Sequence, residues 1–556
     1  MDRKNAAVIK KRIFHPYAVV GLIPAIFFLL FYFYPLSGIL VKSFSLEGGR
    51  NLSFLDQVFG SPRMMKVIWF TFWQAGISTL LTLVCAFPCA FVLSRYTFRG
   101  KRTIRILASI PFVLPAVVVA AAFQACFGDK PFFFGITIDQ PLVLILLAHV
   151  FYNFSVMLRI LTGFWSSLQG RISEAAMVLG ASPAKVFLTV TLPLLKPAIF
   201  AASALVFIFC FSSFGIILIL GGPSYSTIEA EIYRQAAHLF NLPLASFLSL
   251  IQITFTFLLM WGYTSFTRRT ARFSPDTEQI HLKPPVQLGE KLLIAGVVLF
   301  IFCLCVVPLL ALVAASLTHA GKMTLVFYQA LFVNTTGSIF YIPPFYAIKN
   351  SLLFAVVSLL IALTTGICAA LFIRFCDRKF SSRWSNFFDP IFMLPLSTSA
   401  VTLGFGIIIT LDKPPLNLRT SIFLIPIAHA LVGFPFVVRA ILPALRAIPE
   451  QFSEAASMLG ASPLAVFKAI DLPLMAKALV AGAIFAFTIS LGEFGATIFT
   501  SRPETPTIPV AIYRFLSQPG AMNYGQAMAI STILMLVTAA GFVAIEHFRK
   551  ESTEGF

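Results

Sequence analysis

Long runs of apolar residues recur along almost the whole chain and are separated by short polar segments. A transmembrane helix needs about 20 apolar residues to cross the hydrocarbon core of a bilayer. About twelve runs meet this criterion, and their approximate cores are Tyr17 to Val41, Val67 to Leu93, Ile106 to Phe127, Leu142 to Ile160, Ala198 to Leu220, Leu244 to Phe266, Leu292 to Leu317, Ser351 to Ile373, Phe388 to Leu411, Ile422 to Leu442, Leu479 to Phe499 and Ala527 to Ile545. The pattern predicts an all-α polytopic membrane protein. The first run is longer than the apolar core of a signal peptide, so we expect a retained helix.

The second half of the sequence repeats the first at a constant offset of 280 residues. The matches include Leu114-Pro115 with Leu394-Pro395, His149 with His429, Arg159 with Arg439, Phe214-Gly215 with Phe494-Gly495, and Ile232-Tyr233-Arg234 with Ile512-Tyr513-Arg514. One repeat length contains six predicted spans, an even number, so both copies enter the membrane in the same direction. The pattern therefore predicts two parallel six-helix repeats related by a pseudo-twofold axis along the membrane normal.

The polar stretch between the two repeats predicts the domain boundaries. We expect a first repeat over residues 1–266, a linker over 267–290 and a second repeat over 291–556, because the linker contains clustered cations and prolines. The aromatic-rich segment from Thr324 to Ala347 belongs either to the outer interface or to a displaced span.

Composition and charge agree with a membrane protein. The chain is 58% hydrophobic and only 11% charged, whereas soluble domains are roughly 25% charged. The net charge of +19 comes from cations in short loops beside apolar runs, with no basic stripe for nucleic acid. If the N-terminus is cytoplasmic, about 29 of the 41 Lys and Arg residues fall on the cytoplasmic side, which fits the positive-inside rule and places both termini there. The eight cysteines lack the spacing of a metal site or a disulfide framework, so we expect them to pack.

One polar loop returns almost unchanged in each repeat, from Glu174 to Pro183 and from Glu454 to Pro463. The first residues, Glu174-Ala175-Ala176 and Glu454-Ala455-Ala456, favour a helix. Gly180 and Gly460 are suited to end it in the left-handed conformation. Ser182-Pro183 and Ser462-Pro463 then start another helix, with the serine as cap and the proline at the first helical position. Each loop is therefore predicted to be a helix, a sharp turn and a short helix.

These two loops resemble the cytoplasmic signature of the membrane subunits of bacterial ATP-binding-cassette (ABC) importers. That signature reads Glu-Ala-Ala, three residues, Gly, nine residues, then Ile-x-Leu-Pro; the second copy matches it through to Pro473, and the first has Val190 in place of Ile. The resemblance covers nearly the whole chain and implies a type I importer permease fold in the bacterial inner membrane. It also implies that the loops are coupling loops, seated through residues such as Gly180 and Gly460 in clefts of ATPase subunits.

The resemblance and the missing motifs together predict the partners. The chain contains no G-x-x-x-x-G-K-[ST] phosphate cradle, so we expect no cofactor on this chain, no enzymatic activity, and ATP-Mg bound by a separate subunit present in two copies. Loops outside the predicted spans are too short for a substrate-binding domain. We expect a periplasmic or lipid-anchored binding protein that docks on loops such as Gly221 to Pro243 and Ser501 to Tyr524.

The substrate is less constrained by the sequence. A fused pair of repeats resembles the permeases for thiamine and for ferric iron, and the stretches Phe70 to Ala75 and Leu146 to Asn153 favour thiamine. Ser490 to Gly495 also resembles sulfate and molybdate permeases. Glu493 lies in a predicted span, where it would either attract a cationic substrate or form a hydrogen bond between helices. Further polar candidates for the translocation pathway are Ser212, Ser213, Asn153 and Thr488.

The sequence argues against two other classes of protein. An ion-coupled secondary transporter would need paired ionisable residues within its spans, and Glu493 is almost alone there. A membrane-embedded enzyme would need a His-rich metal cluster or a G-x-S-x-G sequence, and neither occurs. His149 and His429 are expected to pack with hydrogen bonds between helices rather than to bind metal.

Overall fold

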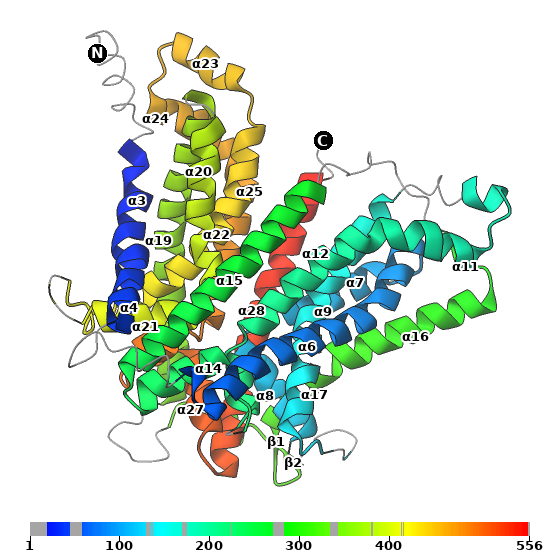
Figure 1. Ribbon diagram of the computed structural model, residues 1–556, viewed down its shortest axis with the longest axis horizontal. Coiled ribbons are helices and arrows are strands. Elements are labelled where there is room, and N and C mark those ends of the chain that lie inside the picture. The colour runs from blue at the N-terminus through cyan, green and yellow to red at the C-terminus, as the bar shows by residue number, and fades with distance from the viewer. Residues whose placement is uncertain are drawn as a thin grey trace.

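The computed structural model describes residues 19–44, 58–128, 135, 137–168, 175–222, 224–270, 283–333, 343–379, 382–412, 414 and 416–553. Nearly all secondary structure in these ranges is helical, and the two strands form one short antiparallel pair, β1 (Thr318–His319) with β2 (Lys322–Met323). Figure 1 shows two groups of helices that spread apart toward the end with α23 and α24 and meet near α14 and α27, with the β1–β2 pair at that second end. The predicted all-α fold is confirmed.

The first repeat contains a series of long helices joined by short ones. In chain order these are α3 (Leu22–Phe28), the π-helical turn η1 (Leu29–Phe33), α4 (Tyr34–Phe44), α6 (Pro62–Arg95), α7 (Lys101–Val113), α8 (Ala116–Phe127), α9 (Pro141–Ser167), α11 (Pro183–Val186), the π-helical turn η2 (Phe187–Thr191), α12 (Leu192–Phe211), α13 (Gly215–Leu220), α14 (Ile228–Tyr233), the π-helical turn η3 (Arg234–His238) and α15 (Leu242–Thr270).

The second repeat has a similar order of long helices and adds a short strand pair. It contains α16 (Leu288–Cys305), α17 (Val307–Leu317), β1, β2, α18 (Val326–Gln329), α19 (Pro344–Lys379), α20 (Ser382–Met393), the 3-10 turn η5 (Leu394–Ser397), α21 (Ala400–Thr410), α22 (Leu424–Ala447), α23 (Glu450–Met458), α24 (Pro463–Val466), the π-helical turn η6 (Phe467–Asp471), α25 (Leu472–Gly492), α26 (Thr497–Thr500), α27 (Ile508–Leu516) and α28 (Ala521–Thr553). The pairs α11 with α24 and η2 with η6 keep the 280-residue offset at both ends.

The number of spans agrees with the sequence. Within the described residues, ten helices are long and apolar enough to cross a membrane, and two bent pairs raise the number to twelve if each counts as one span. In those pairs, α7 and α8 meet at 108°, and residues 388–397 meet α21 at 95°. The prediction of about twelve spans is confirmed, and the predicted spans over Ile106 to Phe127 and Phe388 to Leu411 are the two that bend.

Proline explains the first of these bends. Leu114 is extended, with φ −72° and ψ 140°, and Pro115 follows as the residue before α8. A proline disfavours the helical region for the residue that precedes it and cannot donate a backbone hydrogen bond. The equivalent Leu394-Pro395 lies in η5, where the second repeat leaves its straight helix.

A second kind of break occurs later in each repeat. Helix α12 ends at Phe211 before α13 begins at Gly215, and α25 ends at Gly492 before α26 begins at Thr497. The predicted spans Ala198 to Leu220 and Leu479 to Phe499 are therefore interrupted. Glu493 does not lie inside a helix, since it follows the last residue of α25 in an extended conformation.

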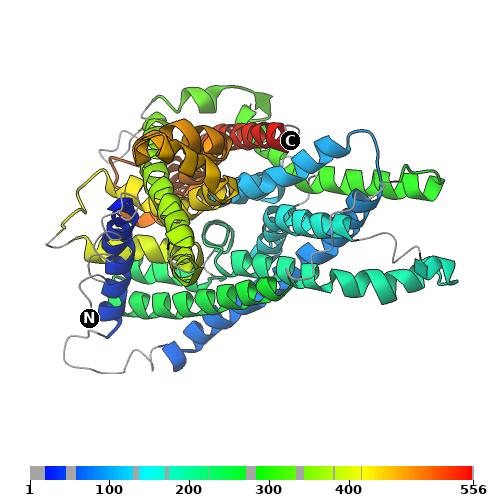
Figure 2. The same cartoon turned by 90° about the horizontal axis from the view of Figure 1, so that it is seen from above.

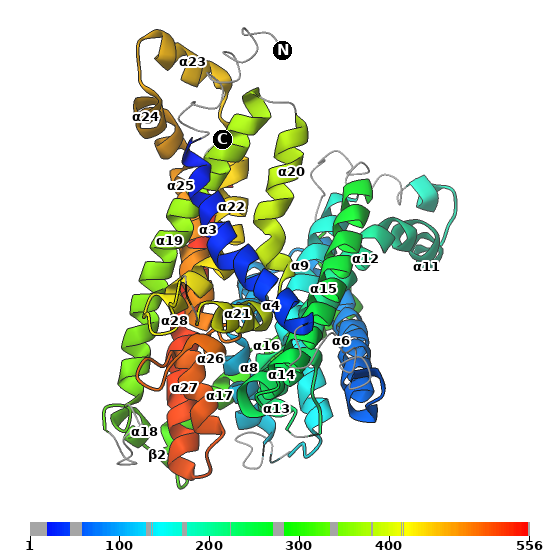
Figure 3. The same cartoon turned by 60° about the vertical axis from the view of Figure 1, so that its left-hand side comes forward.

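The first helices of each repeat lie against the other repeat. Helix α3 packs on α19, and α4 packs on α21 as well as on α15; in the equivalent arrangement, α16 packs on α6 and α7, and α17 packs on α8 and α28. Figures 2 and 3 show the blue N-terminal helices beside the yellow helices of the second repeat. Tyr32 also hydrogen-bonds Thr398 across this contact at 2.6 Å. The two halves are interlocked rather than merely adjacent.

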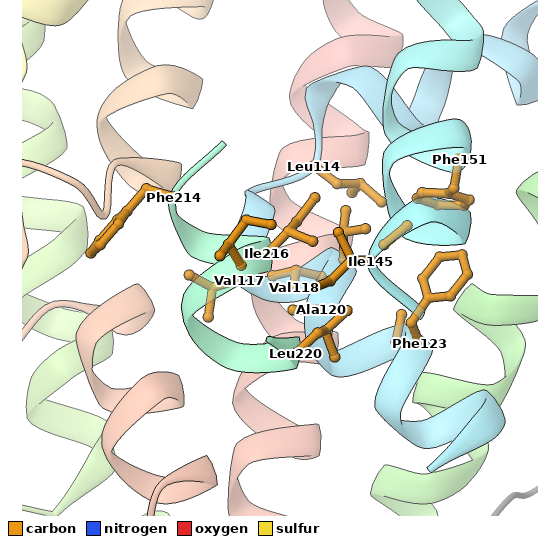
Figure 4. Packing of buried hydrophobic residues seen from close by; sticks show 14 of the residues in the cluster. Leu114, Val117, Val118, Ala120, Phe123, Ile145, Phe151, Phe214, Ile216 and Leu220 are labelled. Carbon is orange, nitrogen blue, oxygen red and sulfur yellow. The ribbon is translucent and has the colours of Figure 1, made fainter. Parts of the chain in front are cut away.

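Helix α8 forms the centre of the first half. Residues 117–122 are fully buried, and α8 contacts α9 and α13 of its own repeat together with α17, α27 and α28 of the other. Figure 4 shows its valines packed against Ile216 and Leu220 of α13 and beside Ile145 of α9. Small and branched residues allow this close approach on every side of the helix.

Candidate functional site

The turn in each repeated loop has the predicted glycine conformation. Gly180 and Gly460 both adopt φ +84°, a region that L-residues with a Cβ rarely enter. Around Gly180, the N–H of Ala181 donates to the carbonyl of Ala176 at 3.1 Å, and the N–H of Gly180 donates to Met177 at 2.9 Å. The second loop repeats both bonds, which define a Schellman C-cap. The expected sharp turn is confirmed in both copies.

The short helices after the turns also form as expected. The Ser182 hydroxyl accepts a hydrogen bond from the N–H of Lys185 at 3.4 Å, and Ser462 accepts one from Ala465 at 3.3 Å. Pro183 and Pro463 are the first residues of α11 and α24. Each short helix continues without interruption through a π-helical turn into α12 or α25. Each loop is therefore joined to a membrane helix without a break in the helical backbone.

Both loops present apolar side chains to solvent. Val178 and Leu179 are 87% and 88% exposed, and their equivalents Met458 and Leu459 are each 90% exposed. Glu454, Ala455 and Ala175 are also exposed, while Ala456 and Ala176 are half-buried; Glu174 lies outside the described residues. Large apolar side chains exposed at equivalent places indicate a surface that another protein covers.

The two loops differ in how they are attached. In the second repeat, the buried Arg374 of α19 donates to Asp471 of η6 at 2.6 Å. Arg378 adds an ion pair with Glu450 of α23 at 2.9 Å. The first repeat has Ser94 and Thr191 at the positions of Arg374 and Asp471, so this buried ion pair belongs to the second loop alone.

Equivalent aromatic residues of the two repeats meet each other at the centre of the molecule. The rings of Phe214 and Phe494 stack with centroids 5.3 Å apart, and those of Tyr233 and Tyr513 lie 6.5 Å apart. Equivalent residues of a twofold-related pair make contact only near the axis. Phe499 joins the group through Tyr233 at 5.6 Å. We call these five rings the axial aromatic cluster.

The axial aromatic cluster lies where helices break. Phe214 directly precedes α13, and Phe494 lies between α25 and α26. In Figure 4, Phe214 points away from the packed side chains of α8 and α13. Gly215 supports the arrangement, because a Cβ there would lie only 3.4 Å from the Phe494 ring and 3.2 Å from Ala116. The broken helices thus bring rings from both halves together on the axis.

Each repeat places a buried histidine beside its break. His149 hydrogen-bonds Ser78 through Nδ1 at 3.0 Å and Ser213 through Nε2 at 2.9 Å. His429 hydrogen-bonds Ser490 at 2.8 Å and Thr497 at 2.6 Å. The expected hydrogen bonds between helices are present, and the described residues contain no group of three side chains suited to a metal.

Glu493 uses its carboxylate within its own segment. Oε1 accepts from the N–H of Ala496 at 2.8 Å, and Oε2 accepts from the N–H of Thr497 at 2.9 Å. His429 Nε2 lies 3.4 Å from Oε2. Of the two roles considered from the sequence, this geometry favours a structural one, because the carboxylate satisfies backbone N–H groups at the start of α26.

The other predicted pathway residues are buried or half-buried around the same region. Ser212 donates to the carbonyl of Ile208 at 2.8 Å, within its own helix. The Asn153 amide donates to the carbonyl of His149 at 3.0 Å, while its Oδ1 has no partner among the described residues. Thr488 faces Gly541 of α28. Ser212 and Ser213 both lie in the break between α12 and α13, and Ser213 also hydrogen-bonds His149.

Two buried carboxylates in α14 were not identified from the sequence, since their segment was predicted to be a loop. Glu231 forms an ion pair with Arg234 at 2.5 Å. Glu229 accepts a hydrogen bond from Gln252 at 2.9 Å and one from Ser399 of the other repeat. No described Lys or Arg forms an ion pair with Glu229. It lies four residues before Tyr233, so the two share a helix face.

Burial determines the electrostatic character of Glu229. The side chain is almost completely inaccessible, and this burial raises its pKa to about 8. A cation placed beside the carboxyl group would lower that pKa again and restore the negative charge. Glu229 therefore favours a cationic neighbour. Comparing the two repeats does not identify Glu229 as a candidate, because the equivalent residue in the second repeat is Pro509.

The segments proposed as docking loops have a different structure from the one expected. About half of Gly221 to Pro243 forms α14 and η3, and just over half of Ser501 to Tyr524 forms α27 and the start of α28. Ile228 and Ile508 begin their helices with N–H groups bonded to Thr71 and Ser351, at 3.0 Å and 2.7 Å. The helical parts are largely buried, while the stretches beside them, such as Leu239 and Phe240, are exposed. In the segment from Thr324 to Ala347, the described residues form α18 and the start of α19 and contain no additional span.

Comparison with known proteins agrees with this architecture. The family described as "binding-protein-dependent transport system inner membrane component" matches the chain twice, over residues 83–272 and 362–550. The chain belongs to this family and is a multi-pass inner-membrane permease component of an ABC importer. Such permeases work in general with an ATPase subunit and a substrate-binding protein.

Several relatives align with most of the chain. The thiamine transport system permease protein ThiP of Escherichia coli is 25% identical over 514 residues, which cover 88% of this chain and 90% of that protein. ThiP of Haemophilus influenzae is 24% identical and covers 95% and 96% of the two chains. PhnV of Salmonella paratyphi A, named for 2-aminoethylphosphonate transport, is 28% identical over 200 residues, which cover 35% of this chain and 74% of that protein.

Proposed function

We propose that this permease carries thiamine through the inner membrane as part of an ATP-driven importer. The observation that carries the proposal is the extent of the similarity to thiamine permeases, which includes both repeats and 88–95% of this chain in the two ThiP proteins. The protein named for a phosphonate covers only 35% of it. Similarity along the whole fused chain supports a shared substrate better than similarity to one repeat.

The axial site suits the chemistry of thiamine. Thiamine contains two aromatic rings, one of which carries a fixed positive charge. Aromatic side chains attract such cations through their ring faces, and the axial aromatic cluster supplies five rings. Glu229, on the same face of α14 as Tyr233, adds a buried carboxyl group. An oxyanion such as sulfate would be repelled by an ionised carboxylate at this position.

The mechanism follows from the two coupling loops. Two ATPase subunits, each holding ATP-Mg, bind the exposed apolar surfaces around Leu179 and Leu459 on the cytoplasmic side. ATP favours the closed ATPase pair through its higher affinity for that state. Closure moves α11 and α24 together, and the continuous helices α12 and α25 separate the axial rings. This chain itself hydrolyses no ATP.

A substrate-binding protein delivers thiamine at the opposite end of the molecule. Both termini then lie on the cytoplasmic side, together with the coupling loops. Exposed apolar residues at the far end include Phe240, Met323 and Phe332, beside the elements α14 and β2. Phe240 belongs to the segment Gly221 to Pro243 predicted from the sequence, and Met323 and Phe332 extend the candidate docking surface beyond that segment.

Uptake by the reconstituted complex tests the proposal. Proteoliposomes containing the permease, its ATPase and its binding protein are assayed with radiolabelled thiamine, ferric iron and sulfate. We expect ATP-dependent uptake of thiamine alone, and a matched preparation with an ATPase deficient in hydrolysis should accumulate none. Uptake of iron or sulfate without thiamine would reject the assignment of substrate while leaving the permease mechanism intact.

A further inference from the structure

A cavity of about 750 Å³ lies away from the axial aromatic cluster, at the end of α9 that leads to the first coupling loop. Its wall is formed by α6, α7 and α9 of the first repeat, and Phe542 of α28 completes it from the second repeat. Volumes of roughly 300–1,000 Å³ are typical of small-ligand pockets. The cavity is therefore large enough for a ligand of metabolite size.

Four cations line this cavity. Lys101, Arg102 and Arg105 come from α7 and Arg159 comes from α9, while no lining residue is acidic. Hydroxyl groups of Ser109, Ser155 and Thr162 are also part of the wall. Two of these hydroxyls already donate within the protein, Ser109 to the carbonyl of Arg105 at 2.8 Å and Ser155 to the carbonyl of Ala108, whereas the buried Thr162 hydroxyl has no partner among the described residues. The wall thus combines concentrated positive charge with one neutral donor that no described residue uses.

The positive-inside rule alone does not account for this arrangement. The rule requires cations in the loop, and Arg95 and Arg99 already supply them. The second repeat has serines at the positions of Lys101, Arg102 and Arg105, although its equivalent loop is on the same side. The three cations of α7 are therefore a feature of the first repeat, and their spacing places them around one cavity.

Hydrogen bonds hold two of these cations in place. Lys101 Nζ donates to the carbonyl of Tyr96 at 2.6 Å, and Arg105 Nη2 donates to the carbonyl of Leu93 at 3.2 Å. Each bond uses one donor of a group that has three in lysine and five in arginine. These bonds hold the Lys101 and Arg105 side chains in place, and the other N–H groups of both side chains remain available to a ligand. No side chain caps the start of α7, so its backbone dipole adds to the attraction for an anion.

We propose that this cavity binds the phosphate group of a phosphate ester. Guanidinium groups match phosphate oxygens with paired donors, and lysine adds a compact charge. The bulk of the ligand would lie against apolar wall residues such as Leu158 and Phe542. Two sources supply this chemistry on the cytoplasmic side: a soluble phosphorylated metabolite and the head group of an anionic phospholipid.

Occupancy of the cavity links the two halves. Because the phosphate is held by α7 and α9 while Phe542 belongs to α28, a bound ligand favours the arrangement of halves in which these helices are close. A ligand at this site therefore slows the transition that alternating access requires. The cavity contains none of the five rings of the axial aromatic cluster.

Binding to the purified full-length permease tests the site in two arms. In the first arm, pyrophosphate is titrated by calorimetry into the permease in nanodiscs of phosphatidylcholine, without ATPase subunits that would bind it themselves. In the second arm, delipidated permease is titrated with phosphatidylglycerol and retained lipid is counted by native mass spectrometry. The double variant Arg102→Gln with Arg105→Gln should weaken binding at least tenfold. The loss should appear in the pyrophosphate arm if the natural ligand is soluble, and in the phosphatidylglycerol arm if it is a lipid head group.

Matched variants make the result specific. Arg99→Gln removes a cation from the same loop outside the cavity and should change binding less than twofold. Arg102→Lys with Arg105→Lys keeps the charge, loses the paired donors and should give intermediate binding. Variant-sensitive pyrophosphate binding identifies a soluble ester, and variant-sensitive lipid retention alone identifies a head group. Binding in neither arm, or equal loss with Arg99→Gln, overturns the proposal.

Discussion

At the scale of single residues, the two buried carboxylates near the axis have different surroundings. Glu493 is surrounded by donors from its own segment, two backbone N–H groups and the Thr497 hydroxyl. Glu229 is bonded only to neutral side chains, from α15 and from the other repeat. A buried carboxyl group without a cationic partner is costly. We therefore assign a structural role to Glu493 and substrate attraction to Glu229.

Glu493→Gln and Glu493→Ala should lower stability more than transport. Removing the carboxylate leaves buried N–H groups of Ala496 and Thr497 unsatisfied, at about 1–3 kcal/mol for each group. Thermal unfolding in detergent should show the larger loss for alanine. The KM for thiamine of the folded glutamine variant should remain within about twofold of the parent value. A tenfold rise in KM at unchanged stability would instead assign Glu493 to the substrate.

Glu229→Gln should have the opposite effect. The side chain keeps its shape and its neutral partners, so the melting temperature should change little, but the KM for thiamine should rise at least tenfold. In the parent protein the KM should fall as the pH rises from 7 to 9, because a carboxyl group with a pKa of about 8 becomes ionised over that interval. The glutamine variant should lack this pH dependence. Identical pH profiles for the two proteins would contradict the assignment.

At the scale of elements, hydropathy predicted the spans but not their bends. The hydropathy of an apolar run is the same whether its helix is straight or broken. The 108° bend at Leu114-Pro115 was therefore not predicted, although the sequence contains the proline. The coupling loops were predicted correctly in detail because glycine, serine and proline act locally there. Helix α14 was missed because the Gly-rich start of its segment is typical of a loop. The meeting of Phe214 with Phe494 depends on tertiary packing, which the repeat alone does not specify.

The exposed surface of the coupling loops gives a prediction about assembly. Leu179→Lys combined with Leu459→Lys should reduce copurification of the ATPase at least tenfold, because two apolar contacts become charged. The melting temperature of the isolated permease should hardly change, since exposed substitutions usually alter stability by less than about 0.5 kcal/mol. Met323→Lys, 84% exposed on β2 at the other end, is the matched control. Undiminished copurification would refute the docking assignment.

The buried ion pair of the second loop gives a prediction about stability. Asp471→Asn leaves the Arg374 guanidinium buried without its counter-charge, which costs about 3–5 kcal/mol in comparable cases. The double substitution Arg374→Ser with Asp471→Thr recreates the residues of the first repeat. It should recover most of the lost stability in thermal unfolding. If the double variant were no more stable than Asp471→Asn, the unpaired charge of Arg374 would not be the cause of the lost stability.

At the scale of the whole molecule, the halves hold together through exchanged first helices. Fragments 1–270 and 271–556 should therefore copurify when coexpressed and should restore uptake. Gly38→Leu in the first fragment should disrupt the complex, because a Cβ at Gly38 would overlap the Thr410 methyl group of α21. Gly76→Leu, where a Cβ meets nothing within 4 Å, is the control. Fragments that separate without any substitution would contradict the interlocked arrangement.

The N-terminal helices α3 and α4, which pack on the second repeat, must also remain without these partners for a time during synthesis. Tyr32 contacts Thr398, a partner 366 residues further along the chain. At roughly 5–20 residues per second, the ribosome needs on the order of 20–70 s to make that partner after the first helix has emerged. During this interval α3 and α4 reside in the lipid with one face uncovered. The newly made N-terminal helices therefore depend on the insertion machinery, or on lipid alone, until translation of the second repeat provides their permanent neighbours.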